Sequence, residues 1–170
     1  MNPEIALLRS ALAEWEINID DERLGMFNRY MELLLEWNEK MNLTAITDPE
    51  KIVIDHFIDS ISPLKLNIIK NGQYVIDVGT GAGFPGLPLK IMMPEIKIVL
   101  LDSLSKRIKF LERVIEDLQL KELQIIHGRA EEYGQKEEFR EKFDVVVSRA
   151  VAPLRVLTEF CIPFAKIDGY

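Results

Sequence analysis

The sequence predicts an α/β fold in which a mostly parallel sheet carries helices on both faces and a helical cap precedes it. Four short apolar segments alternate with segments whose apolar residues recur at helical spacing: Tyr74–Val78, Ile96–Leu101, Leu123–His127 and Phe143–Val147. A glycine-rich turn follows the first of these strands directly, as in the opening unit of a nucleotide-binding sheet. Such sheets bind their ligands at the carboxyl ends of the strands, so functional residues are expected there.

Residues 1–70 have the pattern of helices. Apolar residues recur at helical spacing in a segment that begins at Pro3, and again between about Asp20 and Lys40. A third helical segment is expected over Asp48–Pro63, where the second proline should end it. These helices are amphipathic and must bury one face, so we expect a cap that packs on the α/β core of residues 71–170 as one compact unit.

Composition narrows the class of protein. The chain has 170 residues, of which 48% are apolar, enough for a well-packed core. Its one cysteine, Cys161, excludes an internal disulfide and favours a reducing compartment. The N-terminal segment has acidic residues within its apolar pattern and no basic region before it, unlike a secretory signal. No run approaches the roughly 20 apolar residues that cross a bilayer. We therefore expect a cytoplasmic protein without a membrane partner.

The charge and the positions of the histidines bear on two kinds of partner, nucleic acid and metal ions. The net charge of −7 argues against a surface that coats nucleic acid as a whole. Basic residues are nonetheless grouped locally, with Lys106 and Arg107 in one segment and Arg129 in another. His56 and His127 stand apart, and neither has a cysteine or carboxylate at metal-ligand spacing, so no metal site is expected.

Gly79, Gly81 and Gly83 define the turn after the first strand. Glycines this closely spaced permit positive φ angles and let a ligand lie against the backbone. The segment Gly81–Gly86 also fits the G-x-G-x-x-G pattern of dinucleotide sites, although that pattern alone is weakly specific. Asp77 argues against a dinucleotide, because its carboxylate would repel a pyrophosphate at the start of the next helix.

S-adenosylmethionine fits the same turn better than a dinucleotide does. It has no phosphate, and it carries a sulfonium and an ammonium group that an acid at the strand end would help to hold. Pro85 and Pro88 also remove amide donors from the start of the helix, which disfavours phosphate binding. A purely structural turn and a dinucleotide site remain the alternatives.

Polar residues follow the later strands at the same edge of the sheet. Asp102 lies about twenty residues beyond the glycines, where a carboxylate accepts hydrogen bonds from the ribose hydroxyls of an adenosine. Helix capping is its alternative role, which Ser103 could fill instead. Glu131 lies where an adenine would bind, or is an acid in the first turn of a short helix. Arg149 contacts a ligand, or forms an ion pair with Asp77 or Glu131.

Six motifs in order carry a resemblance to a known family: WNEKMNLT at Trp37–Thr44, HFIDSI at His56–Ile61, DVGTGAGFPGLPL at Asp77–Leu89, LLDSLSKRIKFL at Leu100–Leu111, GRAEEY at Gly128–Tyr133 and VVSRAVAPL at Val146–Leu154. Over about residues 27 to 164 the chain resembles the RsmG family, also called glucose-inhibited division protein B. Members are bacterial methyltransferases that modify N7 of a guanine in small-subunit ribosomal RNA. The resemblance implies a Rossmann-like methyltransferase fold, S-adenosylmethionine as cofactor and S-adenosylhomocysteine as product. It also implies small-subunit RNA, or an assembling subunit, as partner.

The resemblance further implies a set of site residues. The family's cofactor-binding positions correspond to Gly79, Phe84, Asp102, Ala130, Glu131 and Arg149. Their neighbours Gly81 and Ser103 are expected to line the same site. The family's basic positions near the cofactor and the RNA correspond to Lys106, Arg107 and Arg129.

The residues after the fourth strand fit methylation of a ring nitrogen. Exocyclic amines are usually methylated beside an Asn/Asp-Pro-Pro-aromatic stretch, whereas this chain has Ser148–Pro153 there. A pyrimidine carbon needs a cysteine nucleophile, and Cys161 is expected on a helix beyond the strand, in a packing role. Guanine N7 has an exposed lone pair and no proton to lose, so alignment and a suitable field suffice. We assign Arg149 the catalytic role of positioning the guanine through O6 or a nearby phosphate. A nicotinamide oxidoreductase and a non-catalytic binding module of the same fold are the alternatives.

The strand count departs from the family. A methyltransferase of this class has seven strands, and four are recognised here, so the core is expected to lack its C-terminal strands. Lys166–Tyr170 is expected to form a turn into a fifth strand. Phe143–Val147 is so apolar that it should have a neighbour on each side. Without that neighbour its outer edge would be open, which predicts marginal stability, self-association and weak activity.

Overall fold

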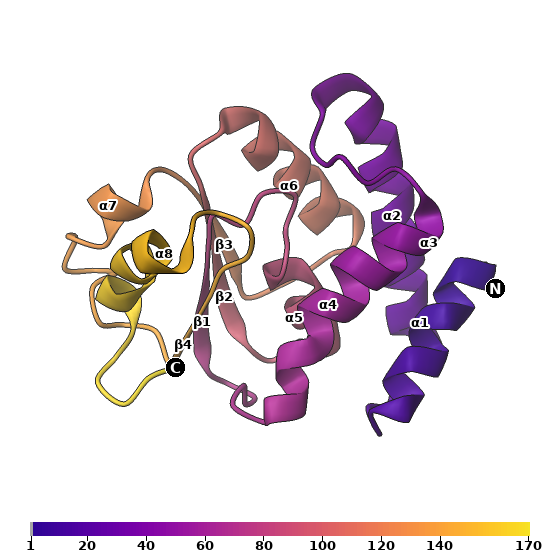
Figure 1. Ribbon diagram of the computed structural model, residues 1–170, viewed down its shortest axis with the longest axis horizontal. Helices are drawn as coiled ribbons and strands as arrows, with labels where there is room; N and C mark the ends of the chain where they lie inside the picture. Colours follow the sequence, from indigo (N-terminus) through magenta and orange to yellow (C-terminus); the bar gives the residue numbers. More distant parts are fainter. Residues whose placement is uncertain (1) are drawn as a thin grey trace.

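The computed structural model describes residues 2–170 and contains a four-stranded sheet between layers of helices (Figure 1). All pairings are parallel, and the strand order is β3–β2–β1–β4, formed by β1 (Tyr74–Val78), β2 (Lys97–Asp102), β3 (Leu123–His127) and β4 (Val145–Val147). The chain builds the sheet outward from β1 to β3 and then returns to place β4 on the other side of β1. The topological switch point therefore lies between β1 and β4, at the carboxyl ends of the strands. The predicted fold class is confirmed.

The first face of the sheet is covered by two helices and, outside them, by the N-terminal elements. Val75 and Leu100 point to this face and belong to a core cluster with side chains of α5 (Gly86–Met92) and α6 (Ser105–Asp117). Successive residues of a strand point to opposite faces, so their neighbours in sequence enter a different core.

The second face is covered by later elements. Ile76 and Val99 belong to a smaller core cluster there, packed against α7 (Ala130–Tyr133), α8 (Leu154–Cys161) and the 3₁₀ turn η3 (Ile162–Phe164). In Figure 1 these elements lie to the left of the sheet, and the N-terminal helices lie to its right. Across residues 2–170, no helix is long and apolar enough to cross a membrane.

The N-terminal cap consists of helical elements that, apart from α3, contribute to the first core cluster: α1 (Pro3–Glu14), α2 (Asp21–Met41), α3 (Pro49–Lys51), the π-helical η1 (Ile52–Ile58), α4 (Asp59–Ile61) and the 3₁₀ turn η2 (Ser62–Leu66). The side chain of Asp20 caps α2 by accepting a hydrogen bond from the backbone amide of Arg23, at 2.8 Å. The expectation that Pro63 ends its helix is wrong, because the chain continues as η2. A proline near the start of a 3₁₀ turn removes only a donor that has no partner there.

The last strand is shorter and less enclosed than expected. β4 comprises three residues, and Val145 is buried whereas the next two are partly exposed. Residues 164–170 run along its outer edge: Lys166 N donates to Phe143 O at 2.9 Å, and the N of Val146 donates to the O of Tyr170 at 2.8 Å. The expectation of an open edge is therefore wrong for residues 143–146, because the terminal segment itself supplies the hydrogen bonds.

Candidate functional site

The glycine-rich turn after β1 is held from beneath by Asp77. This side chain is fully buried, and its Oδ2 accepts hydrogen bonds from Thr80 Oγ1 at 2.6 Å and from Gly86 N at 2.8 Å. Burial raises the pKa of Asp77 to about 7, against the opposing effect of those two donors. Oδ2 thus holds the shape of the turn, whereas Oδ1 is buried without a hydrogen-bond partner among residues 2–170. Asp77 lines neither cavity of the site described below, and its favourable effect on a bound cation stays a prediction.

The glycines of the turn have the backbone conformations that the sequence predicted. Gly79, Gly81 and Gly83 have φ angles of +71°, +64° and +101°. A Cβ atom on Gly83 would lie 2.4 Å from Leu87 Cδ1 and 2.6 Å from the Tyr30 hydroxyl. On Gly81 it would meet nothing closer than a backbone oxygen 4.0 Å away, so this part of the turn borders open space.

Asp102 ends β2 and lies over the turn, with only 2% of its surface exposed. Its Oδ2 accepts from Gly81 N at 2.8 Å and its Oδ1 from Leu104 N at 2.9 Å, while the Arg107 guanidinium lies 3.2 Å away. Asp102 thus holds the residue that precedes α6, although α6 has no side-chain capping bond. Ser103 does not cap the helix, contrary to expectation, because the helix begins one residue later than its position allows.

Two adjoining cavities open along the carboxyl ends of the strands, and both are bounded by Gly79, Asp102, Ser103 and Val151. The smaller, of about 180 Å³, is further lined by residues that follow β3, among them Arg129, Ala130 and Glu131. The larger, of about 350 Å³, is lined by Gly81, Phe84, Arg107 and Arg149 on the side of β1 and β4. The site residues that the sequence singled out, apart from Lys106, therefore border one cleft.

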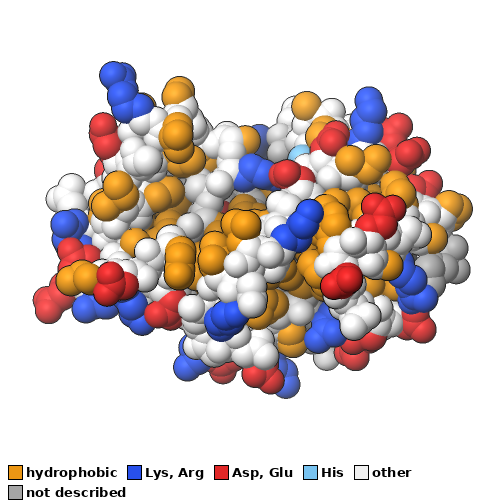
Figure 2. All heavy atoms as spheres, turned by 60° about the horizontal axis from the view of Figure 1, so that its bottom comes forward, with side chains coloured by type: hydrophobic (Ala, Val, Ile, Leu, Met, Phe, Trp, Pro, Cys, Tyr) orange, Lys and Arg blue, Asp and Glu red, His pale blue; other side chains and the backbone are white. Residues whose placement is uncertain are grey.

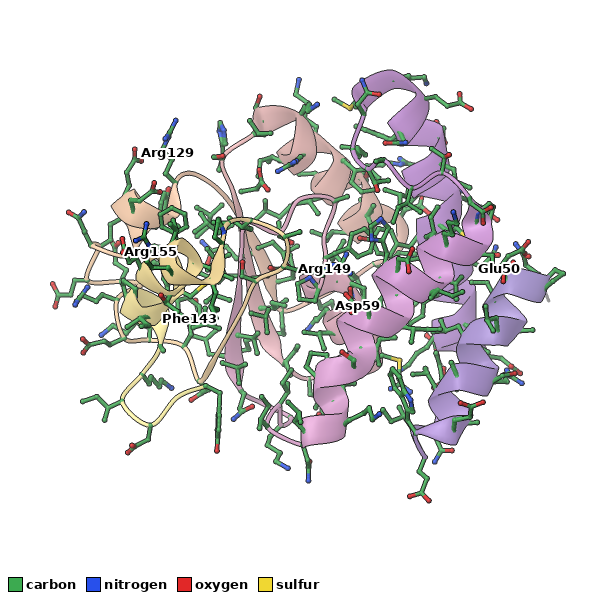
Figure 3. All side chains as sticks on the ribbon, in the orientation of Figure 1. Glu50, Asp59, Arg129, Phe143, Arg149 and Arg155 are labelled. Carbon is green, nitrogen blue, oxygen red and sulfur yellow. The ribbon has the colours of Figure 1, made fainter. Side chains whose placement is uncertain are left out.

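Arg149 reaches across the larger cavity to the N-terminal cap, and Figure 3 shows it beside Asp59. Its Nη1 donates to Asp59 Oδ2 at 2.7 Å and to the Asp55 carbonyl at 2.8 Å, and its Nη2 donates to His56 Nδ1 at 2.9 Å. Its guanidinium carbon also lies 5.2 Å from the centre of the Phe84 ring. The expected ion pair with Asp77 or Glu131 does not form, because the partners come from the cap.

The three basic residues expected to bind RNA have different surroundings. Lys106 Nζ donates to the Met41 carbonyl at 2.8 Å and so joins α6 to the end of α2. Arg107 is paired with Asp102, and its Nε is buried without a hydrogen-bond partner among residues 2–170. Arg129 is exposed and projects outward beside α7 (Figure 3).

Sequence reasoning missed two residues that line the larger cavity, Thr44 and His56. The imidazole stacks on the Phe84 ring, with centres 4.5 Å apart and planes at 13°. Burial and the nearby Arg149 charge lower the pKa of His56 to about 4, so the ring is neutral at physiological pH. Both residues occur in the motifs that resembled the family, which was the one available signal. Their spacing alone has no chemical meaning.

Two further observations concern the chemistry available. Cys161 belongs to the second core cluster, where burial raises the pKa of its thiol to about 11, so it is not a thiolate nucleophile. In the described part of the chain, no three His, Cys, Asp or Glu side chains are grouped as metal ligands.

Comparison with protein families gives a match over residues 23–170 to the family described as rRNA small subunit methyltransferase G, or GidB. This chain belongs to that family. It is 52% identical over 169 residues to the ribosomal RNA small subunit methyltransferase G of Thermoanaerobacter sp. (strain X514), which covers 99% of this chain and 70% of the relative. It is 53% identical over 164 residues to the protein of that name from Clostridium botulinum (strain Loch Maree / Type A3), covering 96% and 69%. The resemblance to the RsmG family is confirmed, and membership makes the chain an rRNA methyltransferase rather than an oxidoreductase or a non-catalytic module.

Solved structures support the fold. A putative S-adenosyl-L-methionine-dependent methyltransferase from Methanococcus maripaludis matches with a TM-score of 0.54 at 18% identity, over 89% of this chain and 63% of its own. A SAM-dependent methyltransferase from Aquifex aeolicus matches with a TM-score of 0.53 at 23% identity, over 74% and 66%. The Rossmann-like methyltransferase fold expected for RsmG is confirmed.

Proposed function

We propose that this chain transfers a methyl group from S-adenosylmethionine to N7 of a specific guanine in small-subunit ribosomal RNA. The observation that carries the proposal is the pair of adjoining cavities at the strand ends, which share Gly79 and Asp102 and are lined by Glu131 on one side and Arg149 on the other. Family membership supports ribosomal RNA as the substrate. The choice of N7 rests on the residues around the cleft.

The residues of the cleft fit S-adenosylmethionine. The carboxylate of Asp102 borders both cavities, and it would accept hydrogen bonds from the two ribose hydroxyls. Ala130 and Glu131 line the smaller cavity, where they would border the adenine. The open space beside Gly81 leaves room for the amino-acid part of the molecule. When bound, the cofactor supplies a methyl group on a positively charged sulfur, ready for an in-line nucleophile.

The larger cavity fits a purine that needs orientation rather than activation. N7 of guanine has an unshared pair in the plane of the ring and loses no proton on methylation, so no base or nucleophile is required. His56 is neutral but already hydrogen-bonded on Nδ1, and Cys161 lies in a core cluster. Arg149 retains protons on Nη2 and Nε for an acceptor on the nucleotide, and its Nη1 anchors it to the cap. We therefore assign it a positioning function, whose effect on rate comes from alignment.

RNA would approach over the rim of the cleft. Arg129 and Arg107 lie on either side of Asp102, and Lys106 lies one residue from Arg107. Cations at this rim would contact phosphates and fix the register of the RNA, while the cavity reads the base. An overall negative charge elsewhere would keep unrelated RNA away.

The experiment that tests the proposal is methyl transfer to isolated small-subunit RNA and to intact small subunits, with radiolabelled S-adenosylmethionine. Digestion to nucleosides and mass spectrometry should yield 7-methylguanosine, at one position by primer extension. Calorimetry should show binding of S-adenosylhomocysteine and none of a reduced nicotinamide dinucleotide. Label in any other nucleoside would refute the N7 assignment while leaving the methyltransferase assignment intact.

A further inference from the structure

Three residues that are far apart in the sequence form a connected chain of hydrogen bonds in the wall of the larger cavity. Arg149 follows β4, His56 lies in η1, and Thr44 lies in the connection between α2 and α3. Arg149 Nη2 lies 2.9 Å from His56 Nδ1, and His56 Nε2 lies 2.9 Å from Thr44 Oγ1. All three residues line the cavity that would receive the base.

The chemistry of Arg149 determines the direction of every bond in this chain. A guanidinium only donates, so His56 Nδ1 must accept and carries no proton. A neutral imidazole has its proton on the other nitrogen, and the lowered pKa of His56 keeps the ring neutral. Nε2–H therefore donates to Thr44 Oγ1. The hydrogen bond from Arg149 thus selects this tautomer.

The hydroxyl of Thr44 is consequently left with one function. Its oxygen already accepts from His56 Nε2 and from the backbone amide of Ile46, at 3.1 Å, which uses both of its lone pairs. Its own proton remains, and within residues 2–170 no acceptor for that proton lies in hydrogen-bonding position. Asn38 accepts from the Thr44 backbone amide at 2.8 Å and so holds the loop in place. Thr44 thus presents a donor to the larger cavity.

The imidazole that orients this hydroxyl is itself held rigidly. It stacks on Phe84, which stacks in turn on the buried Tyr30 with ring centres 5.4 Å apart. Tyr30 donates through its hydroxyl to the Ala82 carbonyl in the glycine-rich turn. The donor is therefore fixed relative to the turn that would hold the cofactor.

We propose that Thr44 is the specificity-determining residue for guanine, donating its hydroxyl proton to O6 of the target base, with His56 as the residue that positions it. This inference rests on the proposed function and adds to it the recognition of the base. Guanine presents N7 and O6 as neighbouring acceptors on one edge, whereas adenine presents an amine donor in place of O6. A donor at O6 accepts guanine, leaves N7 free for the methyl group, and rejects adenine. Arg149 then donates to a phosphate of the RNA and, through Nη2, to His56.

The first test concerns the tautomer and does not depend on activity. Nitrogen-15 NMR of the histidine-labelled protein at pH 7 should show His56 with an unprotonated Nδ1 and a protonated Nε2. The chain has two histidines, so a His127→Gln variant assigns the signals. A protonated Nδ1, or an imidazolium at that pH, would overturn the proposal.

The second test is a double-mutant cycle that combines a substitution of Thr44 with a change of the target base. Small-subunit RNA is prepared by ligation with either guanine or 2-aminopurine, which lacks O6, at the methylated position. Wild type should prefer guanine by about 10- to 100-fold in kcat/KM, the range for a buried donor left without its acceptor. Thr44→Val should lose a similar factor on guanine and discriminate between the two RNAs by less than about 3-fold, whereas Thr44→Ser should behave as wild type. S-adenosylhomocysteine affinity should be equal in all three.

The outcomes separate the two proposals. If wild type methylates guanine N7 but Thr44→Val still discriminates as wild type does, the assignment of Thr44 is wrong and the proposed function stands. If wild type forms no 7-methylguanosine, the proposed function fails and this inference fails with it. A Thr44→Val protein with weakened S-adenosylhomocysteine binding would also refute the proposal, since the residue would then serve the cofactor.

Discussion

At the scale of single residues, the cleft depends most on Asp102, which is a structural acceptor and also the ligand that we propose for the ribose. It receives hydrogen bonds from the turn after β1 and from the start of α6, and yet it borders both cavities. The two carboxylates near the turn therefore have different roles. Asp77 shapes the turn from beneath, and Asp102 closes it from above and faces the cleft.

We predict that Asp102→Ala weakens S-adenosylhomocysteine binding at least tenfold. The variant loses two charge-assisted hydrogen bonds to ribose, each worth at most about 1.5–3 kcal/mol. It should also melt at a lower temperature, because Gly81 N and Leu104 N lose their acceptor. Calorimetry on folded protein measures the first effect, and Arg107→Gln, which keeps the carboxylate, is the matched control. Wild-type affinity in Asp102→Ala would exclude the ribose role.

We predict a pH-dependent stability difference between Asp77→Asn and wild type. The raised pKa of Asp77, about 7 against an unperturbed 3.8, means that the native state holds this proton more tightly than the unfolded state. This group therefore contributes stability below about pH 4 that is lost as the pH rises towards 7. The asparagine variant cannot ionise, so its melting temperature should rise relative to wild type between pH 5 and pH 8. Other titrating groups, His56 included, are common to both proteins. A difference that stays constant with pH would mean that Asp77 ionises normally.

At the scale of elements, the glycine-rich turn does two separable jobs at neighbouring positions. Gly83 lets the turn pack tightly on α5 and on Tyr30, whereas Gly81 keeps the cleft side free of a side chain. Both have positive φ angles, but +64° at Gly81 lies in the left-handed region that other residues can enter, whereas +101° at Gly83 lies outside it. Backbone strain and the contacts of a new Cβ therefore both make alanine more costly for stability at Gly83 than at Gly81.

We predict that Gly83→Ala loses stability and that Gly81→Ala loses cofactor binding. The first places a Cβ 2.4 Å from Leu87, and overpacking of this kind costs about 1–3 kcal/mol beyond the backbone strain. The second meets no atom closer than 4.0 Å but projects where the cofactor would lie. Thermal melts and calorimetry with S-adenosylhomocysteine should rank the two variants in opposite orders. The same rank order in both measurements would contradict the division of roles.

At the scale of the whole molecule, the distributions of charged and of exposed apolar side chains bear on the partners of the protein. Figure 2 shows basic, acidic and hydrophobic side chains interspersed over one face, with no single-sign field. Under the proposed function, we expect RNA affinity to come from the few cations at the rim of the cleft, Arg107 and Arg129 among them. Toward the C-terminus, Leu154, Ile162, Ile167 and Tyr170 are exposed, each by 65% or more.

We predict that Arg129→Ala reduces the slope of log K against log salt by about 0.7–0.9 for RNA binding, as expected for one phosphate contact. Its melting temperature should not change, because the side chain is exposed. Lys106→Ala should reduce the slope similarly but also destabilise the protein, since it frees the Met41 carbonyl at the end of α2. Lys97→Ala, at the amino end of β2 and so at the far end of the strand from Asp102, is the control and should leave the slope unchanged. RNA binding insensitive to salt would rule out this rim.

We also predict concentration-dependent self-association through the exposed apolar residues of the last twenty positions. Exposed apolar side chains favour association, and the pairing of residues 164–170 leaves the side chains of Ile167 and Tyr170 exposed. Sedimentation velocity over a hundredfold range of concentration measures it, with Ile162→Ser/Ile167→Ser as a comparison. A monomer at all concentrations would show that this surface is tolerated.

The sequence by itself determined the elements and the edge of the sheet at which the site forms. Strands β1 to β3, the turn at Gly79–Gly83 and the placement of Asp102 and Glu131 follow from signals that neighbouring residues carry: apolar runs, glycine spacing and caps. Such signals report local conformation, and the rule that parallel strands bind ligands at their carboxyl ends turns them into a site.

The tertiary structure decided which way side chains point and which distant segments meet. Asp77 points into the protein because side chains alternate between the two faces along β1. Residues 164–170 cover the edge of β4 because the chain folds back after α8 and hydrogen-bonds to residues 143–146. His56 and Arg149 meet although 93 positions separate them, and their contact sets the tautomer that orients Thr44. No spacing in the sequence encodes that contact, because it depends on how the cap packs against the sheet.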